Sequence, residues 1–165
     1  ERAEREREIL RLEKVRLEEE MAHKNSELTA MALNLIEKNQ FLQALKNDVV
    51  EATERVGAKN ETAIKDLIRK VDGSLHSERD WKAFEAQFEM VHRGFLHAVA
   101  IRCPTLTRAE LKVCALLRLN MSSKEVADVL SISARTAEHH RYRIRKKLGL
   151  ADDMNVSTYL ATLEV

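Results

Sequence analysis

The first 56 residues contain no glycine and no proline, so neither of the strongest helix breakers interrupts this stretch. Apolar residues recur along it with alternating spacings of three and four positions. This spacing is the heptad repeat of a coiled coil, in which a narrow apolar seam faces a partner helix. From Ala3, the seam continues through Leu10, Leu17, Met21, Leu28, Met31, Leu35, Leu42, Leu45 and Val49. The sequence therefore predicts one long helix over residues 1–56.

Basic residues fill the other positions of this seam, namely Arg7, Lys14, Lys24 and Lys38. Polar seam residues lower the stability of a coiled coil but favour a particular register or number of helices. We expect the seam from Leu10 to Val49 to join two copies of the chain as a homodimer, most simply with parallel helices. The alternative is a bundle with further helices, because Ile9, Leu33 and Ile36 widen the stripe.

Residues 57–103 are expected to form a short helical linker or packing block. Helical spacing of apolar residues predicts a helix over residues 60–71, which we expect to end at residues 72–74, Asp-Gly-Ser. Ser77 and Asp80 resemble a helix cap in front of an aromatic stripe, Trp81, Phe84 and Phe88. Gly94 interrupts the pattern before another apolar run over residues 95–101. The stripe is typical of a packed core or docking face, and a ligand pocket is the alternative.

Three short helices are predicted between residues 107 and 150. Thr107 and Glu110 have the spacing of a capping box in front of a helix over residues 108–119. A second helix is expected to begin after Ser122 or Ser123, and a third to begin after Ser133. The third helix should continue to residue 148 and end at Gly149. The turn between the second and third helices is short and polar.

The charge of this segment differs from that of the whole chain. Residues 105–150 carry ten Lys or Arg and four Asp or Glu, whereas the 165-residue chain has a net charge of +1. The third helix is predicted to have one packing stripe, formed by Ala137, Ile144 and Leu148. Its opposite face carries long side chains with hydrogen-bonding groups, which suit the major groove of DNA. The alternative is an ordinary solvated helix face.

These residues resemble the LuxR-type (GerE-like) helix-turn-helix of bacterial transcription regulators. The resemblance covers about sixty C-terminal residues and depends on Leu106, Thr107, Glu110, residues 123–127, Leu130, Ile132, Ser133, Thr136, His140, Ile144, Lys147 and Leu148. The residues around this pattern are similar to Bacteroidetes-type sensor-regulators, in which such a domain ends a longer chain. The resemblance implies a four-helix DNA-binding domain over residues 104–165 and double-stranded DNA as the partner.

The resemblance also implies a set of DNA contacts. Glu138, His139 and Tyr142 match the positions that read base edges in the family. The positions that match or adjoin phosphate contacts are Lys124, Ser133, Arg135, Thr136, Arg141, Arg145 and Lys146. Ala137 and Glu138 depart from the usual family residues, which puts the target sequence in doubt but not the mode of binding. We interpret His140 as a packing residue.

The last segment contains Val156, Tyr159, Leu160 and Leu163 at helical spacing behind a possible cap at residues 152–155. In the family, the fourth helix pairs two domains across a two-fold axis. Closure of the small core is an equally suitable role for so short an apolar stripe.

The remaining composition predicts neither an enzyme nor a cofactor site. The sequence has no glycine-rich phosphate loop, and His92, His97 and Cys103 match no standard zinc spacing. No run reaches the eighteen apolar residues of a membrane span. Cys103 and Cys114 are expected to be free thiols in the cytoplasm. Because the chain starts at Glu1, we expect a piece of a longer protein with upstream sensor modules or a membrane anchor.

The sequence thus predicts an all-α chain in three parts: a coiled-coil dimerisation helix (1–56), a helical packing block (57–103) and a LuxR-type helix-turn-helix domain (104–165). The predicted function is sequence-specific DNA binding as the output end of a signal-sensing protein, with no small-molecule substrate. The alternative is a coiled-coil scaffold that binds nucleic acid only non-specifically. A scaffold, however, has no need for positive charge beside base-reading side chains.

Overall fold

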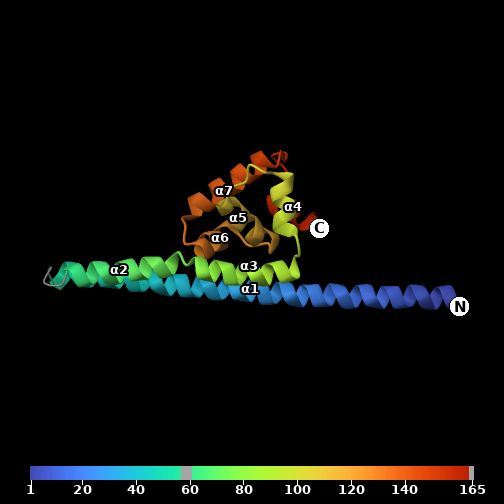
Figure 1. Ribbon diagram of the computed structural model, residues 1–165, viewed down its shortest axis with the longest axis horizontal. Coiled ribbons are helices and arrows are strands. Elements are labelled where there is room, and N and C mark those ends of the chain that lie inside the picture. Colours follow the sequence, from blue (N-terminus) through green and yellow to red (C-terminus); the bar gives the residue numbers. More distant parts are fainter. Residues whose placement is uncertain (57–60, 164–165) are drawn as a thin grey trace.

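The computed structural model describes residues 1–56 and 61–163, and these ranges contain helices and no strand (Figure 1). The predicted all-α fold is confirmed. The helices are α1 (Arg2–Val56), α2 (Glu61–Leu75), α3 (Glu78–Val91), α4 (Phe95–Arg102), α5 (Arg108–Arg118), α6 (Ser123–Leu130), α7 (Ala134–Lys147) and α8 (Val156–Thr162). None of these helices combines the length and apolar character that crossing a membrane requires.

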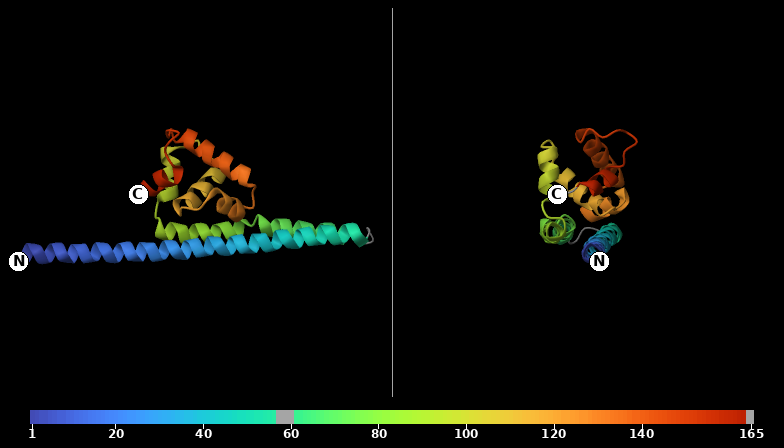
Figure 2. Two further views of the ribbon diagram at one scale, coloured as in Figure 1. Left: turned by 180° about the vertical axis from the view of Figure 1, so that it is seen from behind. Right: turned by 90° about the vertical axis from the view of Figure 1, so that its right-hand side faces the viewer.

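Helix α1 is a single long rod, and α2 and α3 run back along its second half in the opposite direction (Figures 1 and 2). The other helices form a compact head above this hairpin. The inner face of α1 is buried at Leu28, Ala32, Ile36 and Asn39, where α3 and α6 cover it. Hydrophobic burial on this face therefore joins the long helix to the rest of the chain.

The predicted dimer seam is divided by this packing. Leu28 is only 3% exposed, and Met31 and Leu35 pack partly buried against the same intramolecular core. Leu10 and Leu17, by contrast, are 65% and 54% exposed. Leu28, Met31 and Leu35 thus pack against helices of the same chain, as the bundle alternative predicts, and pairing of the seam with a second copy stays a prediction. Periodicity identifies an apolar face but does not say which helix covers it.

The seam residues after Leu35 belong to the part of α1 that lies beside α2. Leu42 and Val49 are half-buried, while Leu45 is exposed. Helices α2 and α3 of the predicted packing block therefore lie against the second half of α1.

Helix α2 continues through Gly73 and ends at Leu75, beyond the end predicted at residues 72–74. A glycine inside a helix costs about 1 kcal/mol relative to alanine. Val71 and Leu75 are both buried, and their packing offsets this cost. The early end predicted from the Asp-Gly-Ser segment is therefore wrong. The predicted helix start at Asn60 lies outside the described residues.

The aromatic stripe of α3 forms part of the core. Ser77 caps α3 by accepting a hydrogen bond from the backbone N–H of Asp80, as the sequence predicts. Trp81, Phe84 and Phe88 are buried, with ring centroids 5.2 and 6.1 Å apart along the series. Their faces are filled by other side chains, so they form a packed core and not a ligand pocket. Gly94, with φ of 71°, makes the sharp turn into α4.

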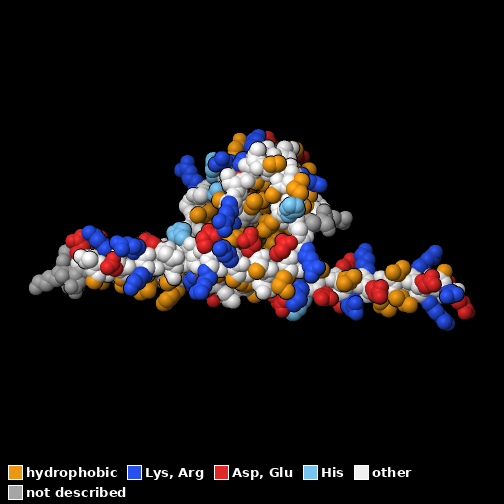
Figure 3. Space-filling model, viewed as in Figure 1, with side chains coloured by type: hydrophobic (Ala, Val, Ile, Leu, Met, Phe, Trp, Pro, Cys, Tyr) orange, Lys and Arg blue, Asp and Glu red, His pale blue; other side chains and the backbone are white. Residues whose placement is uncertain are grey.

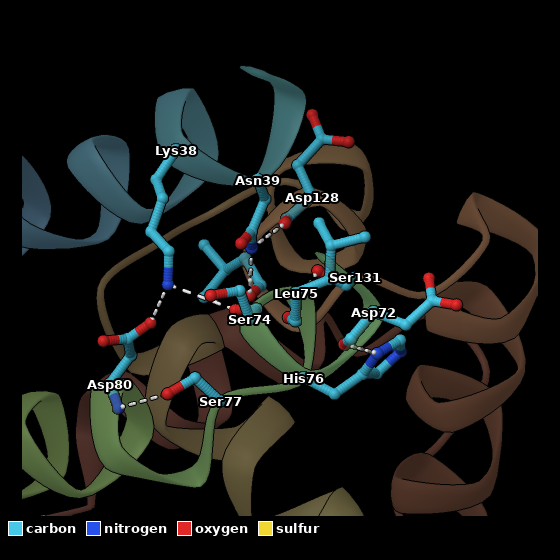
Figure 4. A network of polar contacts seen from close by, with 11 residues as sticks. Lys38, Asn39, Asp72, Ser74, Leu75, His76, Ser77, Asp80, Asp128 and Ser131 are labelled. Atoms are coloured by element: carbon cyan, nitrogen blue, oxygen red, sulfur yellow. Dashed lines mark hydrogen bonds and ion pairs between the residues drawn. The ribbon is translucent and has the colours of Figure 1, made fainter. Parts of the chain in front are cut away.

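Polar contacts fix how the head sits on the hairpin (Figure 4). The side-chain amide of the buried Asn39 donates hydrogen bonds to the carbonyl oxygens of Asp128 and Val129, at 3.0 and 3.1 Å. These carbonyls belong to the last turn of α6, where few backbone N–H groups remain to bond them; Asp128 also accepts from the backbone N–H of Ser131 at 3.4 Å. Ser131 in addition donates to the carbonyl oxygen of Leu75 at 2.9 Å. The head is thus held at one angle to α1 and α2.

Helix α8 closes the core of the head. Val156, Leu160 and Leu163 are buried, and the guanidinium of Arg118 donates to the carbonyl oxygen of Leu160 at 2.6 Å. Of the two roles that its sequence allowed, core closure is the one that the buried stripe serves.

Asn39→Ala removes the side-chain amide donor from both carbonyl oxygens at the end of α6, and Asp128 keeps only its bond from the backbone N–H of Ser131. We expect the free energy of unfolding to fall by about 1–3 kcal/mol. Urea denaturation followed by circular dichroism measures this change. Asn34→Ala, on the exposed side of the same helix, is the matched control and should stay within about 0.5 kcal/mol of the parent. If both substitutions lower the free energy of unfolding equally, the hydrogen bonds of Asn39 do not contribute specifically to stability.

His92 links the end of α3 to α1, because its Nε2 lies 2.7 Å from Oδ1 of Asn25. Burial lowers the pKa of His92 to about 4, and the charge of Arg118 acts in the same direction. The folded protein therefore holds this imidazole neutral, while the unfolded chain takes up its proton near the ordinary value of 6.5.

The contribution of neutral His92 to stability should be complete above pH 6.5 and should be lost as the pH falls toward 4. His92→Gln retains a hydrogen-bonding side chain without a titrating group. We expect its stability to decline less steeply than that of the parent over this window, as measured by thermal unfolding at a series of pH values. The exposed His97→Gln should follow the parent curve. Parallel curves for all three proteins would contradict the assignment.

Candidate nucleic-acid interface

Helices α5, α6 and α7 form a trihelical unit whose ends are defined by capping residues. Thr107 and Glu110 form the predicted capping box of α5, and Ser122 and Glu125 form an equivalent box at the start of α6. Ser133 accepts a hydrogen bond from the backbone N–H of Thr136 and caps α7. Such caps satisfy the free N–H groups of a first helical turn. The chain therefore turns where the sequence predicts.

The C-terminal ends are equally well defined. Asn120 and Ser131 follow α5 and α6 in the left-handed conformation, with φ of 59° and 52°, and Gly149 follows α7 with φ of 67°. At each end two backbone N–H groups return to carbonyls of the last turn, as in a Schellman motif. Only the third of these ends carries the glycine that makes such a turn visible in the sequence.

A buried carboxylate ties α7 to the start of α5. Glu110 is fully buried, and its Oε2 accepts hydrogen bonds from the Lys147 ammonium at 2.7 Å and the Thr107 backbone N–H at 2.8 Å. Nε of Arg143 lies 3.5 Å from Oε1. Burial raises the pKa of Glu110, but the hydrogen bonds from Lys147 and Thr107 bring the pKa below its ordinary value. The sequence predicts Glu110 only as a cap, because its partners in α7 are distant in the chain.

The inward face of α7 is apolar, as predicted. Ala137 and Ile144 are completely buried, and Leu148 packs partly buried against the same core. His140 is half-buried with its Nδ1 enclosed, and burial lowers its pKa. The packing role predicted for His140 agrees with this position. These contacts fix the rotation of α7 about its own axis and so determine which side chains face outward.

The outward face brings together the side chains predicted to read base edges. Glu138, His139 and Tyr142 are exposed and line a shallow groove along α7 with Arg135 and Thr136. Helix α7 lies on the side of the head away from α1, so the hairpin does not cover this groove (Figures 1 and 2). Lys, Arg and His side chains project along this edge of the head (Figure 3).

The residues predicted to contact phosphate flank this groove in different ways. Lys124 is exposed in the first turn of α6, and Arg141 reaches toward it by donating to the Ser123 hydroxyl at 3.0 Å. The hydroxyls of Ser133 and Thr136 lie 2.7 Å apart at the start of α7. Together these residues place cationic and hydroxyl groups around the beginnings of both helices, where backbone N–H groups also favour anions.

Lys146 and Arg145 lie near the other end of α7. The Lys146 ammonium is 5.5 Å from the centre of the Tyr142 ring and 3.7 Å from a carboxylate oxygen of Asp152. Arg145 is half-buried, and its Nε is enclosed without a hydrogen-bond partner among the described residues. Lys146 thus extends the exposed face, whereas Arg145 lies at the margin of the packed face.

This geometry is that of a helix-turn-helix DNA-binding domain. Helix α7 has the position of a recognition helix, with one face anchored in a core and the other free to enter a major groove. Helix α6 precedes it across a short turn. Within residues 1–56 and 61–163, no cluster of three or more His, Cys, Asp or Glu side chains is arranged to hold a metal ion.

Comparison with known proteins assigns the domain more narrowly. Residues 104–160 match the family described as bacterial regulatory proteins, luxR family. Residues 104–160 are therefore similar to the helix-turn-helix domain of the LuxR family, and this similarity supports DNA binding and transcription regulation as the role of this domain. Neither a curated protein nor a solved structure matches the chain.

Glu110→Gln removes the charge that Lys147 and Arg143 share. Breaking a buried ion pair by removing one partner costs about 3 kcal/mol, so we expect a loss of this order in urea denaturation at pH 7. Because the pKa of Glu110 is lowered, the parent should lose this contribution as the pH falls through the acid range, and the variant should not. Glu138→Gln, on the exposed face, is the control and should unfold like the parent. Similar stabilities for both variants would overturn the anchoring role of Glu110.

Proposed function

We propose that this protein is a sequence-specific transcription regulator that reads DNA with the outward face of α7 and works as a dimer. The main support for this proposal is that α7 has one buried and one exposed face. Ala137 and Ile144 are fully buried, while Glu138, His139 and Tyr142 are exposed together along one groove. A helix anchored in this way presents a constant set of side chains to a major groove.

Each of the three readers has suitable chemistry. The carboxylate of Glu138 can accept a hydrogen bond from the N4 amino group of cytosine, and His139 and Tyr142 can bond donors or acceptors on base edges. The proposed phosphate contacts fix the register without reading sequence; they are Lys124, Ser133, Arg135, Thr136, Arg141, Arg145 and Lys146. Among these, Arg145 has to move its guanidinium out of its half-buried position to reach a phosphate.

The dimer is proposed to form through the first half of α1, where Leu10, Leu17 and Met21 are exposed on the seam. Two linked heads convert the encounter with a second half-site into an intramolecular step, which raises the apparent affinity. Two-fold related half-sites then match a two-fold related protein. We further propose that the chain is the output end of a longer Bacteroidetes-type sensor-regulator that acts in the cytoplasm and receives its signal through α1.

The test is selection of binding sites from a random duplex pool with the whole chain, followed by titration of the winner against scrambled DNA at two salt concentrations. Enrichment of a two-fold repeated motif, with at least about thousandfold discrimination, is the expected result. Salt-sensitive binding without an enriched motif would overturn sequence-specific reading and leave a coiled-coil scaffold with non-specific affinity.

Two substitutions on α7 separate reading from positioning. Glu138→Ala should change the preferred sequence, because it removes an acceptor for a base edge. Lys146→Ala should weaken binding to all sequences alike and reduce the salt slope by about one unit. Both are measured on the selected site and its single-base variants. The same shift in sequence preference from both variants would contradict the two roles.

A further inference from the structure

An apolar groove lies where α3 ends against α1. Its volume is about 630 Å³. Its apolar lining is formed by Leu17, Met21, Leu28 and Met31 of α1 with Met90 and Val91 of α3, and its polar lining by Glu20, Lys24, Glu27 and Gln87. The side chain of Met90 is 69% exposed, although it follows the buried aromatic stripe of the same helix. Exposed apolar side chains that gather in a groove with a polar border are typical of a protein–protein contact surface.

The groove continues into the exposed part of the seam. Helix α3 ends at Val91, whereas α1 extends well beyond it toward the N-terminus (Figure 2). Leu10, Leu17 and Met21 lie on the same face of α1 as Leu28, at heptad spacing. The seam therefore continues beyond the end of its covering layer, with Arg7, Lys14 and Lys24 as basic positions between the apolar ones. Hydrophobic side chains remain visible along the projecting half of α1 (Figure 3).

The charges beside the seam indicate which helix covers it. In four successive heptads a glutamate immediately precedes the same seam position, as Glu6 before Arg7, Glu13 before Lys14, Glu20 before Met21 and Glu27 before Leu28. In a parallel pair Arg7 and Lys14 face the same residues of the second copy, and Glu6 and Glu13 of the second copy lie beside them and offset the repulsion between the basic groups. In an antiparallel pair the glutamates of the two helices face each other and repel. The charge pattern therefore fits a second copy of this chain in parallel orientation.

We propose that the groove is a dimerisation surface that receives α1 of a second copy, and that α3 contributes Met90 and Val91 to the interface. The two α1 helices pair along residues 3–24. From Leu28 onward, each α1 is covered on this face by α3 of its own chain. The pair of α1 helices is therefore expected to widen there into four helices, both α1 and both α3. This inference depends on the proposed dimer and names the surface that completes it.

The arrangement connects the dimer to the DNA-reading heads. Met90 and Val91 belong to the helix that carries Phe84 and Phe88, and these rings lie in the core that continues into the head. His92, directly after α3, contacts Asn25 of α1 at the edge of the same region. A change in how two α1 helices pair would therefore reach the heads through α3 as well as through α1.

The first test compares the dissociation constants of charge variants of the whole chain by analytical ultracentrifugation. Met90→Glu should raise the dimer dissociation constant by about tenfold or more, because a carboxylate would be buried in the groove. Ile101→Glu, which alters a similarly exposed residue on α4 outside the groove, is the matched control and should have no effect. Leu17→Glu should dissociate the dimer. Circular dichroism establishes that each variant is folded.

The outcomes separate the two proposals. Dissociation by Leu17→Glu without an effect of Met90→Glu would overturn the groove and leave the coiled-coil dimer intact. A parent chain that stays monomeric at all concentrations would overturn both. Loss of dimer in Ile101→Glu as well as Met90→Glu would show that the effect is not specific to the groove, and would also overturn it.

The second test determines the relative orientation of the two α1 helices by oxidising variants that each carry one introduced cysteine. Leu17→Cys should give a covalent dimer, because a parallel pair places residue 17 of one chain opposite residue 17 of the other. Leu12→Cys lies on the opposite side of α1 and is the control that should not cross-link. The native Cys103 and Cys114 are buried. A dimer in which Leu17→Cys forms no disulfide would overturn the parallel arrangement.

Discussion

The structure depends on the burial of one face of α1 between Leu28 and Asn39. Helix α3 covers this face from one side and α6 from another, so a single surface carries both the hairpin and the DNA-binding head. The aromatic side chains of α3 extend the same core into the head through Phe95 and Val99. Without this contact the long helix would be joined to the head only through the chain itself.

Apolar burial is strong but non-directional, and buried polar groups supply the orientation. Asn39 binds two carbonyl oxygens at the end of α6, which specifies one position of the head along α1. Glu110 acts similarly within the head, because its contacts with Lys147 and Thr107 join the end of α7 to the start of α5. Each contact is costly to break, since its partners would remain buried without a bond.

The reading face of the protein is a consequence of this internal order. Helix α7 exposes Glu138, His139 and Tyr142 because Ala137 and Ile144 are held in the core on its other side. The proposed mechanism needs a recognition helix whose rotation and angle are constant. The contacts of α7 with α5 fix its rotation, and those of α6 with α1 fix the angle of the head. The exposed half of α1 is then available to relate one such head to another.

The sequence by itself determined the features that depend on neighbouring residues. The caps at Thr107, Ser122 and Ser133, the length of α1 and the two faces of α7 all follow from local hydrogen bonding and helical periodicity. Only the tertiary structure decided which helix covers the seam at Leu28, why α2 continues through Gly73, and which residues of α7 pair with Glu110. These outcomes depend on contacts between residues far apart in the chain, and an apolar or charged pattern specifies that a partner is needed without specifying which one.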